Sequence, residues 1–197
     1  MENWNKTSSD WLYNQLVSEY GYSINSLNIS FPYEYASKLV SLNWSDMLFA
    51  IQHGYMKHQS AIDHAEKELL RDIFPQAALD LTCLRPGEAV FPHSIHPYIN
   101  ELAESVEDCV KIESKDKIMY VLLKWIYEHR YDYDDIIDVL TIICDDFCFP
   151  ESIYHFAWKY APMKEGDFGT AESNKVKVFA YWKQFLDEQQ KKWEEAF

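Results

Sequence analysis

The chain has few residues of the kinds that mark several common protein classes. It holds only five glycines and seven prolines in 197 residues, too few for the closely spaced turns of a β-sandwich. Its four cysteines include no CxxC pair, and no apolar run approaches the roughly 18–20 residues that cross a bilayer. With no secretory leader pattern at the N-terminus, we expect a cytoplasmic protein whose thiols are reduced and buried.

Positive charge is also scarce, and its scarcity is uneven along the chain. There are 18 Lys and Arg against 32 Asp and Glu, a net charge of −14. Residues 101–158 carry 5 basic and 14 acidic side chains, and residues 132–158 carry seven acids without a Lys or Arg. Such a field repels nucleic acid and anionic lipid and attracts basic proteins. We therefore expect no nucleic-acid partner and no membrane partner.

The apolar content is high enough for a sizeable core. Apolar residues make up 48% of the chain and aromatic residues 16%, which excludes a disordered protein. The apolar spacing predicts an all-α fold: one domain over 1–197, a single irregular bundle of about eight or nine helices. Residues 1–6 are expected to be frayed, and 163–172 to form a flexible loop. The helix 116–129 is apolar nearly all round, which is typical of a central helix.

Capping residues, glycines and prolines place the other helix ends. Ser8 or Ser9 is expected to begin a first helix that ends near Gly21, and Asn43 or Ser45 a second that ends at Gly54. The stretch 76–97 is expected to be irregular. The remaining helices are expected from Ser60 to before Pro75, from Pro97 to about Ile112, over 116–129 and 134–147, from Glu151 to Tyr160, and from Ser173 onward.

The segment 134–147 separates an apolar side from an acidic side. At about 100° per residue, Asp134, Asp138, Thr141 and Asp145 fall opposite the apolar positions. Three interpretations stay open: a solvated face with an Asp N-cap, a docking surface for a basic partner, or a cation site without an EF-hand loop. The residues expected to bind a partner are Asp132, Asp134, Asp135, Asp138, Asp145 and Asp146.

Other titratable side chains give no clear catalytic signature. His53, His58 and His64 form one group in the sequence and His93 and His96 another, without HExxH spacing. They predict polar or loop-anchoring histidines, with a metal-dependent hydrolase as a weaker alternative. Cys144 and Cys148 predict core packing rather than ligation. The sequence lacks GxSxG, Walker A, GxGxxG and kinase motifs. We expect no enzyme activity, no metal and no cofactor.

Several motifs together resemble a bacterial family described as a domain of unknown function, number 2247. The resemblance covers about residues 40–195. It rests on a Trp and a Gly before an Ala-containing helix, a Lys-Trp helix leading to an acidic turn, the CDDFCFP run, a YAP tripeptide and a Trp-bearing last helix. The residues concerned are Trp44, Gly54, Ala65, Lys124, Trp125, Tyr127, Asp135, Cys144–Pro150 and Tyr160–Pro162.

The resemblance implies an all-helical fold and a place among immunity proteins encoded beside polymorphic bacterial toxins. It supplies no catalytic residues. Together with the acidic face, it leads to one expectation: a non-enzymatic binding protein that neutralises a cognate, basic toxin. The alternative is an oligomeric helical scaffold or regulatory module without a toxin partner. Neither the toxin nor the oligomeric state follows from the sequence.

Overall fold

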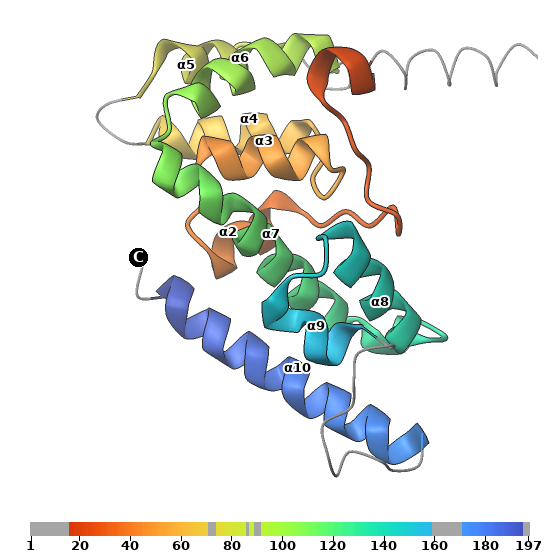
Figure 1. Ribbon diagram of the computed structural model, residues 1–197. Coiled ribbons are helices and arrows are strands. Elements are labelled where there is room, and N and C mark those ends of the chain that lie inside the picture. Colours follow the sequence, from red (N-terminus) through yellow and green to blue (C-terminus); the bar gives the residue numbers. More distant parts are fainter. Residues whose placement is uncertain (1–15, 71–73, 86, 89–91, 159–170, 195–197) are drawn as a thin grey trace, which may run out of the picture. The chain divides into compact units, whose positions relative to one another are not determined.

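The computed structural model describes residues 16–70, 74–85, 87–88, 92–158 and 171–194. In this part of the chain every regular element is helical (Figure 1), which confirms the predicted all-α class. The elements are α2 (Tyr33–Leu39), α3 (Trp44–Gln52), α4 (Gln59–Glu68), α5 (Gln76–Thr82), α6 (Pro92–Glu104), α7 (Asp108–Glu128), the 3₁₀ helix η2 (Arg130–Asp132), α8 (Ile136–Asp146), α9 (Glu151–Ala157) and α10 (Ala171–Glu194).

The chain divides into two compact units. The first comprises residues 1–35 and 42–114, and the second comprises 36–41 and 115–197. The boundary at residue 114 falls inside α7. The expectation that 1–197 forms one domain stays a prediction.

In the first unit, α3 begins and ends where its sequence predicts. The Asn43 side chain accepts hydrogen bonds from the amides of Ser45 (2.8 Å) and Asp46 (3.1 Å), and Asp46 accepts one in return from the Asn43 amide. This capping box satisfies amides that have no partner inside the helix. After the helix, Gly54 has φ +73°, a conformation that glycine adopts without steric cost.

The helices of the first unit form two layers around an apolar core. Figure 1 shows α5 and α6 above α4 and α3. The largest fully buried side chains of these helices are apolar, and each contributes roughly 1.5–3 kcal/mol. Those with almost no exposure are Met47, Ile51, Leu81, Ile95, Ile99 and Leu102.

Several predicted boundaries in this unit are wrong. The stretch 76–97 is not irregular, because it contains α5 and the first turn and a half of α6. The helix α6 begins at Pro92, where a missing N–H is tolerated, and Pro97 lies inside it rather than at its start. The helix α4 ends at Glu68 instead of continuing toward Pro75. The short helix α2 has too few residues for apolar spacing to reveal it.

The second unit is built on the later part of α7. From residue 118 onward its side chains are buried on most sides, as predicted for a central helix: Ile118, Met119, Tyr120, Val121, Leu122, Leu123 and Ile126. However, α7 begins at Asp108, so the predicted break between helices near residues 112–116 is wrong. The break lies instead at residues 105–107.

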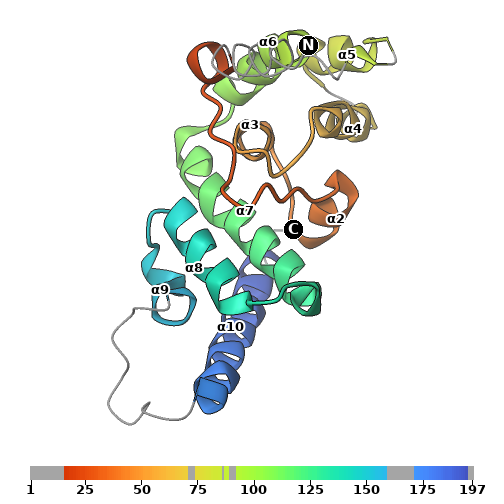
Figure 2. The ribbon, with the colours of Figure 1, turned by 90° about the vertical axis from the view of Figure 1, so that its right-hand side faces the viewer.

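The remaining helices of the second unit cover this apolar surface. The helix α8 runs beside the later part of α7 (Figures 1 and 2) and follows the predicted range 134–147 closely. Aromatic rings join α10 to its neighbours: Tyr127 meets Trp182 edge to face at 5.0 Å, and Phe156 lies 5.9 Å from Phe185. These contacts account for the burial of Trp182.

Some sequence expectations fall outside the described residues. They are the frayed 1–6, the Ser8 or Ser9 cap, the loop 163–172 and the YAP tripeptide Tyr160–Pro162. The end of the first helix is visible as a turn at 16–20, followed by Gly21 at φ +66° as expected.

Candidate functional site

The acidic side chains predicted to bind a partner lie on η2, on α8 and between them. Asp132, Asp134, Asp135, Asp138 and Asp145 are exposed and Asp146 is half-buried. Glu151, the next acid along the chain, is exposed at the start of α9. We call this set of seven residues the acidic face. The predicted separation of acidic and apolar sides is confirmed, since Ile136, Leu140, Ile143 and Phe147 are buried.

One acid of this face also has a structural task. The Asp135 carboxylate is the N-cap of α8 and accepts hydrogen bonds from the amides of Ile137 (2.9 Å) and Asp138 (3.3 Å). Asp138 lies in the first turn, where the positive end of the helix dipole favours an acid. The acids at this end of α8 therefore stabilise the helix in the free protein.

The acids at the other end of α8 have the opposite effect. Asp145 and Asp146 occupy the last turn, which contains no basic residue. The unsatisfied carbonyls there make the helix end electronegative, so an acid near them costs roughly 0.3–1 kcal/mol. The sequence thus keeps an exposed carboxylate, Asp145, at the end of the helix where the dipole disfavours its charge.

Thr141 limits the acidic face on one side. The sequence places it with the acids, but it is half-buried, and its hydroxyl shares its one hydrogen between the carbonyl oxygens of Ile137 (2.9 Å) and Ala157 (3.3 Å). The second bond joins α8 to the end of α9. Thr141 is therefore a packing contact, and the open face consists of carboxylates.

Exposed aromatic side chains lie close in sequence to both ends of the acidic face. Tyr131 is 84% exposed next to Asp132, and Phe149 is 42% exposed between Asp146 and Glu151. The Phe149 ring meets the Trp158 ring edge to face at 4.8 Å. Sequence reasoning did not single these two residues out. The signal that could have predicted their exposure is an aromatic residue that lies among acids in a stretch without apolar periodicity.

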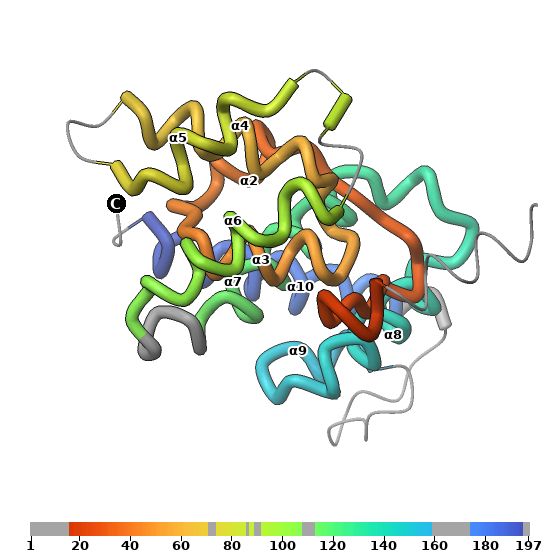
Figure 3. The backbone as a smooth tube through the Cα atoms, turned by 90° about the horizontal axis from the view of Figure 1, so that it is seen from above, coloured from red at the N-terminus to blue at the C-terminus, as the bar shows by residue number. Residues whose placement is uncertain are grey.

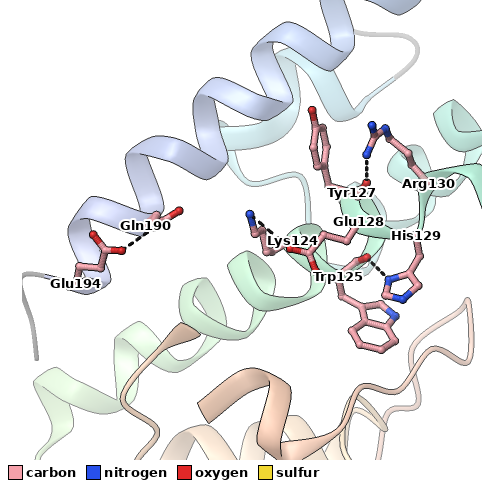
Figure 4. A network of polar contacts seen from close by, with 8 residues as sticks. All are labelled: Lys124, Trp125, Tyr127, Glu128, His129, Arg130, Gln190 and Glu194. Atoms are coloured by element: carbon pink, nitrogen blue, oxygen red, sulfur yellow. Dashed lines mark hydrogen bonds and ion pairs between the residues drawn. The ribbon is translucent and has the colours of Figure 1, made fainter. Parts of the chain in front are cut away.

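Arg130, which begins η2 just before the acidic face in sequence, is held by aromatic rings. The Arg130 guanidinium lies 4.5 Å from the centre of the Tyr127 ring and 4.4 Å from that of Tyr131, and it donates to the Tyr127 carbonyl oxygen. Figure 4 shows Arg130 beside Tyr127, with the stacked Trp125 and His129 close by. Cation–π contacts of this kind occupy the guanidinium and support the exposed Tyr131.

The CDDFCFP run forms the turn that presents Phe149. The Phe149 amide donates to the Cys144 carbonyl and the Cys148 amide to the Asp145 carbonyl, both at 2.8 Å. This is a Schellman turn, which usually has glycine at the position of Cys148. Here Cys148 (φ +59°) and Phe149 (φ +54°) are both left-handed. Side chains rarely adopt this conformation, and strain of this kind is concentrated at functional positions.

The thiols differ more than the sequence predicts. Cys144 is fully buried, as expected, and burial together with Asp145 raises its pKa to about 11. Cys148 and Cys83 are exposed, so the expectation of buried thiols is wrong for both. The reason for Cys148 is the left-handed turn, which directs the side chain after α8 away from the apolar side.

The histidines are paired differently from their grouping in the sequence. His58 and His96, from different sequence groups, meet at the hydroxyl of Tyr22. His64 is buried and bonds to the Tyr33 hydroxyl through Nδ1 (2.9 Å), while Nδ1 of His53 bonds to a backbone carbonyl at the surface. His93 is exposed. Among the described residues, no group of three or more His, Cys, Asp or Glu side chains is placed to hold a metal ion.

Within the described ranges, no helix combines the length and the apolar character that crossing a bilayer requires. The expected cytoplasmic location stays a prediction.

Comparisons with known proteins give one match. No curated protein and no solved structure matches the chain. A family model described as "Uncharacterized protein conserved in bacteria (DUF2247)" matches residues 33–190. The matched range contains α2 to α9, the acidic face and most of α10. Because the match covers well over half of the chain, this protein belongs to the uncharacterised bacterial family DUF2247.

Proposed function

We propose that this protein is a non-enzymatic cytoplasmic binding protein that docks a basic protein on its acidic face, and that the partner is a bacterial toxin domain which it neutralises. The observation that carries the proposal is the exposed set of carboxylates on η2, α8 and the start of α9. The identification of the partner as a toxin rests in addition on the family resemblance and on the positive charge expected of a protein that binds such a face.

The placement of Asp145 supports docking over simple solvation. A solvated face needs no acid at the electronegative end of a helix, where it lowers the stability of the free protein. A cation supplied by a partner would compensate both the helix end and the Asp145 carboxylate. The same arrangement would accelerate association, because opposite charges steer the encounter of two proteins.

The exposed aromatic residues would supply binding affinity that carboxylates alone do not. Charges at an interface rim contribute mainly to association rate, whereas buried aromatic anchors contribute most of the affinity. Tyr131 and Phe149 are both exposed and border the acidic residues in sequence. The Schellman turn holds the Phe149 backbone in one conformation, which lowers the entropy lost on binding. The proposed interface therefore has two aromatic anchors and an acidic rim.

The first experiment identifies the partner and then tests the face. The tagged protein is used to capture partners from its bacterial host at low and at high salt. A single basic partner released by salt is then purified, and its association is measured by biolayer interferometry. A triple variant that carries Asp134→Lys, Asp138→Lys and Asp145→Lys together is compared with the wild type. We expect the triple variant to associate about tenfold more slowly or worse, with a weaker salt dependence.

A matched control separates the acidic face from net charge. Glu101 is an exposed acid on α6 of the first unit, so Glu101→Lys changes charge without touching the face. Unchanged association of the triple variant, or equal slowing per charge in Glu101→Lys, would show that the partner binds elsewhere. Capture of only further copies of the same chain, with a matching mass by light scattering, would favour the oligomeric scaffold instead.

A second variant tests the argument from the helix dipole. Asp145→Asn removes the charge while keeping the size of the side chain. We expect its stability to rise by a few tenths of a kcal/mol and its affinity for the partner to fall. Chemical denaturation and interferometry on the same sample measure the two effects. Loss of both stability and affinity would mean that Asp145 supports the fold rather than binding.

A further inference from the structure

Three titratable side chains from distant segments of the first unit meet at one point. The Tyr22 hydroxyl makes hydrogen bonds to Nε2 of His58 and to Nε2 of His96, the latter at 2.9 Å. Tyr22 follows the helical turn at 16–20, His58 immediately precedes α4, and His96 lies in α6. Tyr22 is 6% exposed and His96 is fully buried. The cluster therefore joins three separate parts of the unit.

The number of hydrogens in this cluster determines its charge. A phenol hydroxyl has one hydrogen, so it donates to one imidazole and accepts from the other. Both contacts are satisfied when both histidines are neutral and have opposite tautomers. A proton added at the accepting Nε2 would leave two N–H donors facing one oxygen. Because the site is buried, the added charge would also lose its hydration.

The groups around the cluster offer no compensating charge. The Tyr20 ring stacks on His96 with centroids 4.5 Å apart, and Asn100 contacts His96 from one turn further along α6. The neighbouring charged or basic residues in sequence are Glu19, Lys57 and His93, and all three are exposed. Glu19 is the one carboxylate among them, and its exposed charge is screened by water.

Burial sets the direction of the pKa shifts. It lowers the pKa of His58 to about 4. It also lowers the pKa of His96 to about 4, where the nearby His58 acts in the same direction and the Asn100 contact in the opposite one. Burial and the neighbouring Tyr20 raise the pKa of Tyr22. Between about pH 4 and pH 6.5, each histidine would therefore be neutral in the closed cluster and charged once exposed.

Tyr22 lies in a segment that is tied along the end of α3 and the turn after it. The amides of Ser23 and Asn25 donate to the carbonyls of Gln52 and His53, each at 3.0 Å, and that of Phe31 donates to Tyr55 at 2.9 Å. The Gln52 side chain donates to the Tyr20 carbonyl at 2.8 Å. We call residues 20–31 the strap. Its path is visible in Figure 3 in red to orange.

We propose that Tyr22, His58 and His96 form a proton-operated clasp that holds the strap against the first unit at neutral pH and releases it in acid. This inference is independent of the acidic face, which lies in the second unit. Release would uncover the rings of Tyr20 and Tyr22 and the start of α4. It would change the surface of the first unit in response to acidification.

The sign follows from proton linkage. The open strap binds more protons than the closed one wherever the pH lies between the open and closed pKa values of the histidines. Closure is therefore fully favoured above about pH 6.5 and weakens as the pH falls toward about 4. For each histidine that charges, the population of the open strap rises by up to about tenfold per pH unit in this interval.

Hydrogen exchange at named amides tests the proposal in the full chain. The amides of Ser23, Asn25 and Phe31 report on the strap, and those of Leu122 and Leu123 in α7 report on global unfolding. Exchange is measured at about pH 7.5 and about pH 5 and normalised to the intrinsic rate at each pH. We expect protection of the strap amides to fall at least tenfold at the lower pH and to stay below the protection of the α7 amides at both pH values, because the strap opens without global unfolding.

Variants assign the effect to the two histidines. In the double variant His58→Gln and His96→Gln, strap protection is expected to lose its pH dependence. His129→Gln, in the second unit, is the matched control and should behave like the wild type. Should the double variant fail to fold, an NMR titration of the wild-type histidines decides: pKa values of His58 and His96 well below 6.5 support the clasp.

Any one of four results from these measurements would overturn the proposal. They are strap amides that exchange only as fast as those of α7 at both pH values, unchanged strap protection at the lower pH, unchanged pH dependence in the double variant, and ordinary histidine pKa values. A stoichiometric metal ion that is retained by the wild type and lost in the double variant would also overturn it, since the cluster would then be a metal site.

Discussion

The amide of Phe149 donates a 2.8 Å hydrogen bond to the carbonyl oxygen of Cys144, five residues earlier. This bond ends α8 and requires the residue just before Phe149, Cys148, to adopt the left-handed region, with φ +59°. A glycine would adopt that conformation without steric cost. The chain instead has a cysteine there and a left-handed phenylalanine after it. The turn thus combines an ordinary hydrogen-bond pattern with unusual residues.

Replacing Cys148 with glycine should stabilise the protein. The substitution removes the steric cost of a left-handed side chain, and the larger entropy of glycine in the unfolded chain offsets part of the gain. We expect a net increase of about 0.5–1 kcal/mol in the free energy of unfolding, measured by urea denaturation. Cys83 is the matched control, because it is also exposed but has φ −83°. Cys83→Gly should be neutral or destabilising, and a stabilising effect there would contradict the explanation.

The two cysteines of the CDDFCFP run should differ in reactivity. Cys144 is buried with a pKa of about 11, so almost none of it is thiolate at neutral pH, whereas Cys148 is exposed. We expect iodoacetamide to label Cys148 quickly in the native protein and Cys144 only after denaturation. Peptide mass spectrometry distinguishes the two sites. Equal labelling of both in the native state would show that the end of α8 opens readily.

Asp135 should matter for stability as much as for binding. Its carboxylate caps α8, so Asp135→Ala is expected to lower the free energy of unfolding by about 1 kcal/mol. Asp134→Ala, one residue earlier and also exposed, should change it by less than about 0.5 kcal/mol. Asp135→Asn keeps an oxygen able to cap the helix and should restore most of the loss. A failure of asparagine to restore it would mean that charge, not capping, is what counts there.

Tyr120 should tolerate the loss of its hydroxyl. The side chain is fully buried, and its oxygen has no hydrogen-bond partner within the described part of the chain. Burial, with smaller effects from Glu194, Glu128 and Asp187, raises its pKa to about 12. Tyr120→Phe removes an unsatisfied polar group and should leave stability unchanged or raise it by up to about 1 kcal/mol. Thermal denaturation measures the effect.

The control for this substitution is Tyr22→Phe in the first unit. That hydroxyl bonds to two histidines, so its removal leaves two ring nitrogens without their partner. We expect a loss of stability of about 1–3 kcal/mol. Similar effects of the two substitutions would mean that the hydrogen bonds around Tyr22 contribute little.

Short-range patterns predicted those parts of the fold that depend on neighbouring residues. The capping residue Asn43, the glycine at 54, the apolar later part of α7 and the two sides of α8 all follow from spacing and local chemistry. The helix boundaries near prolines did not follow from local patterns, because Pro92 and Pro97 are equally suited to a first helical turn when each is considered in isolation. The core residues of α5 and α6 decide between them by packing, and Pro97 is then accepted inside the helix.

By itself, the sequence determined the helical class, the excess of acid and the alignment of carboxylates along one side of α8, because these properties depend on composition and on intervals of a few residues. Only the tertiary structure decided that Thr141 is covered and that Cys148 and Phe149 are exposed. It also brought Tyr22 to His58 and His96, which are 36 and 74 residues away. Contacts over such separations depend on how helices pack, and no local period encodes them.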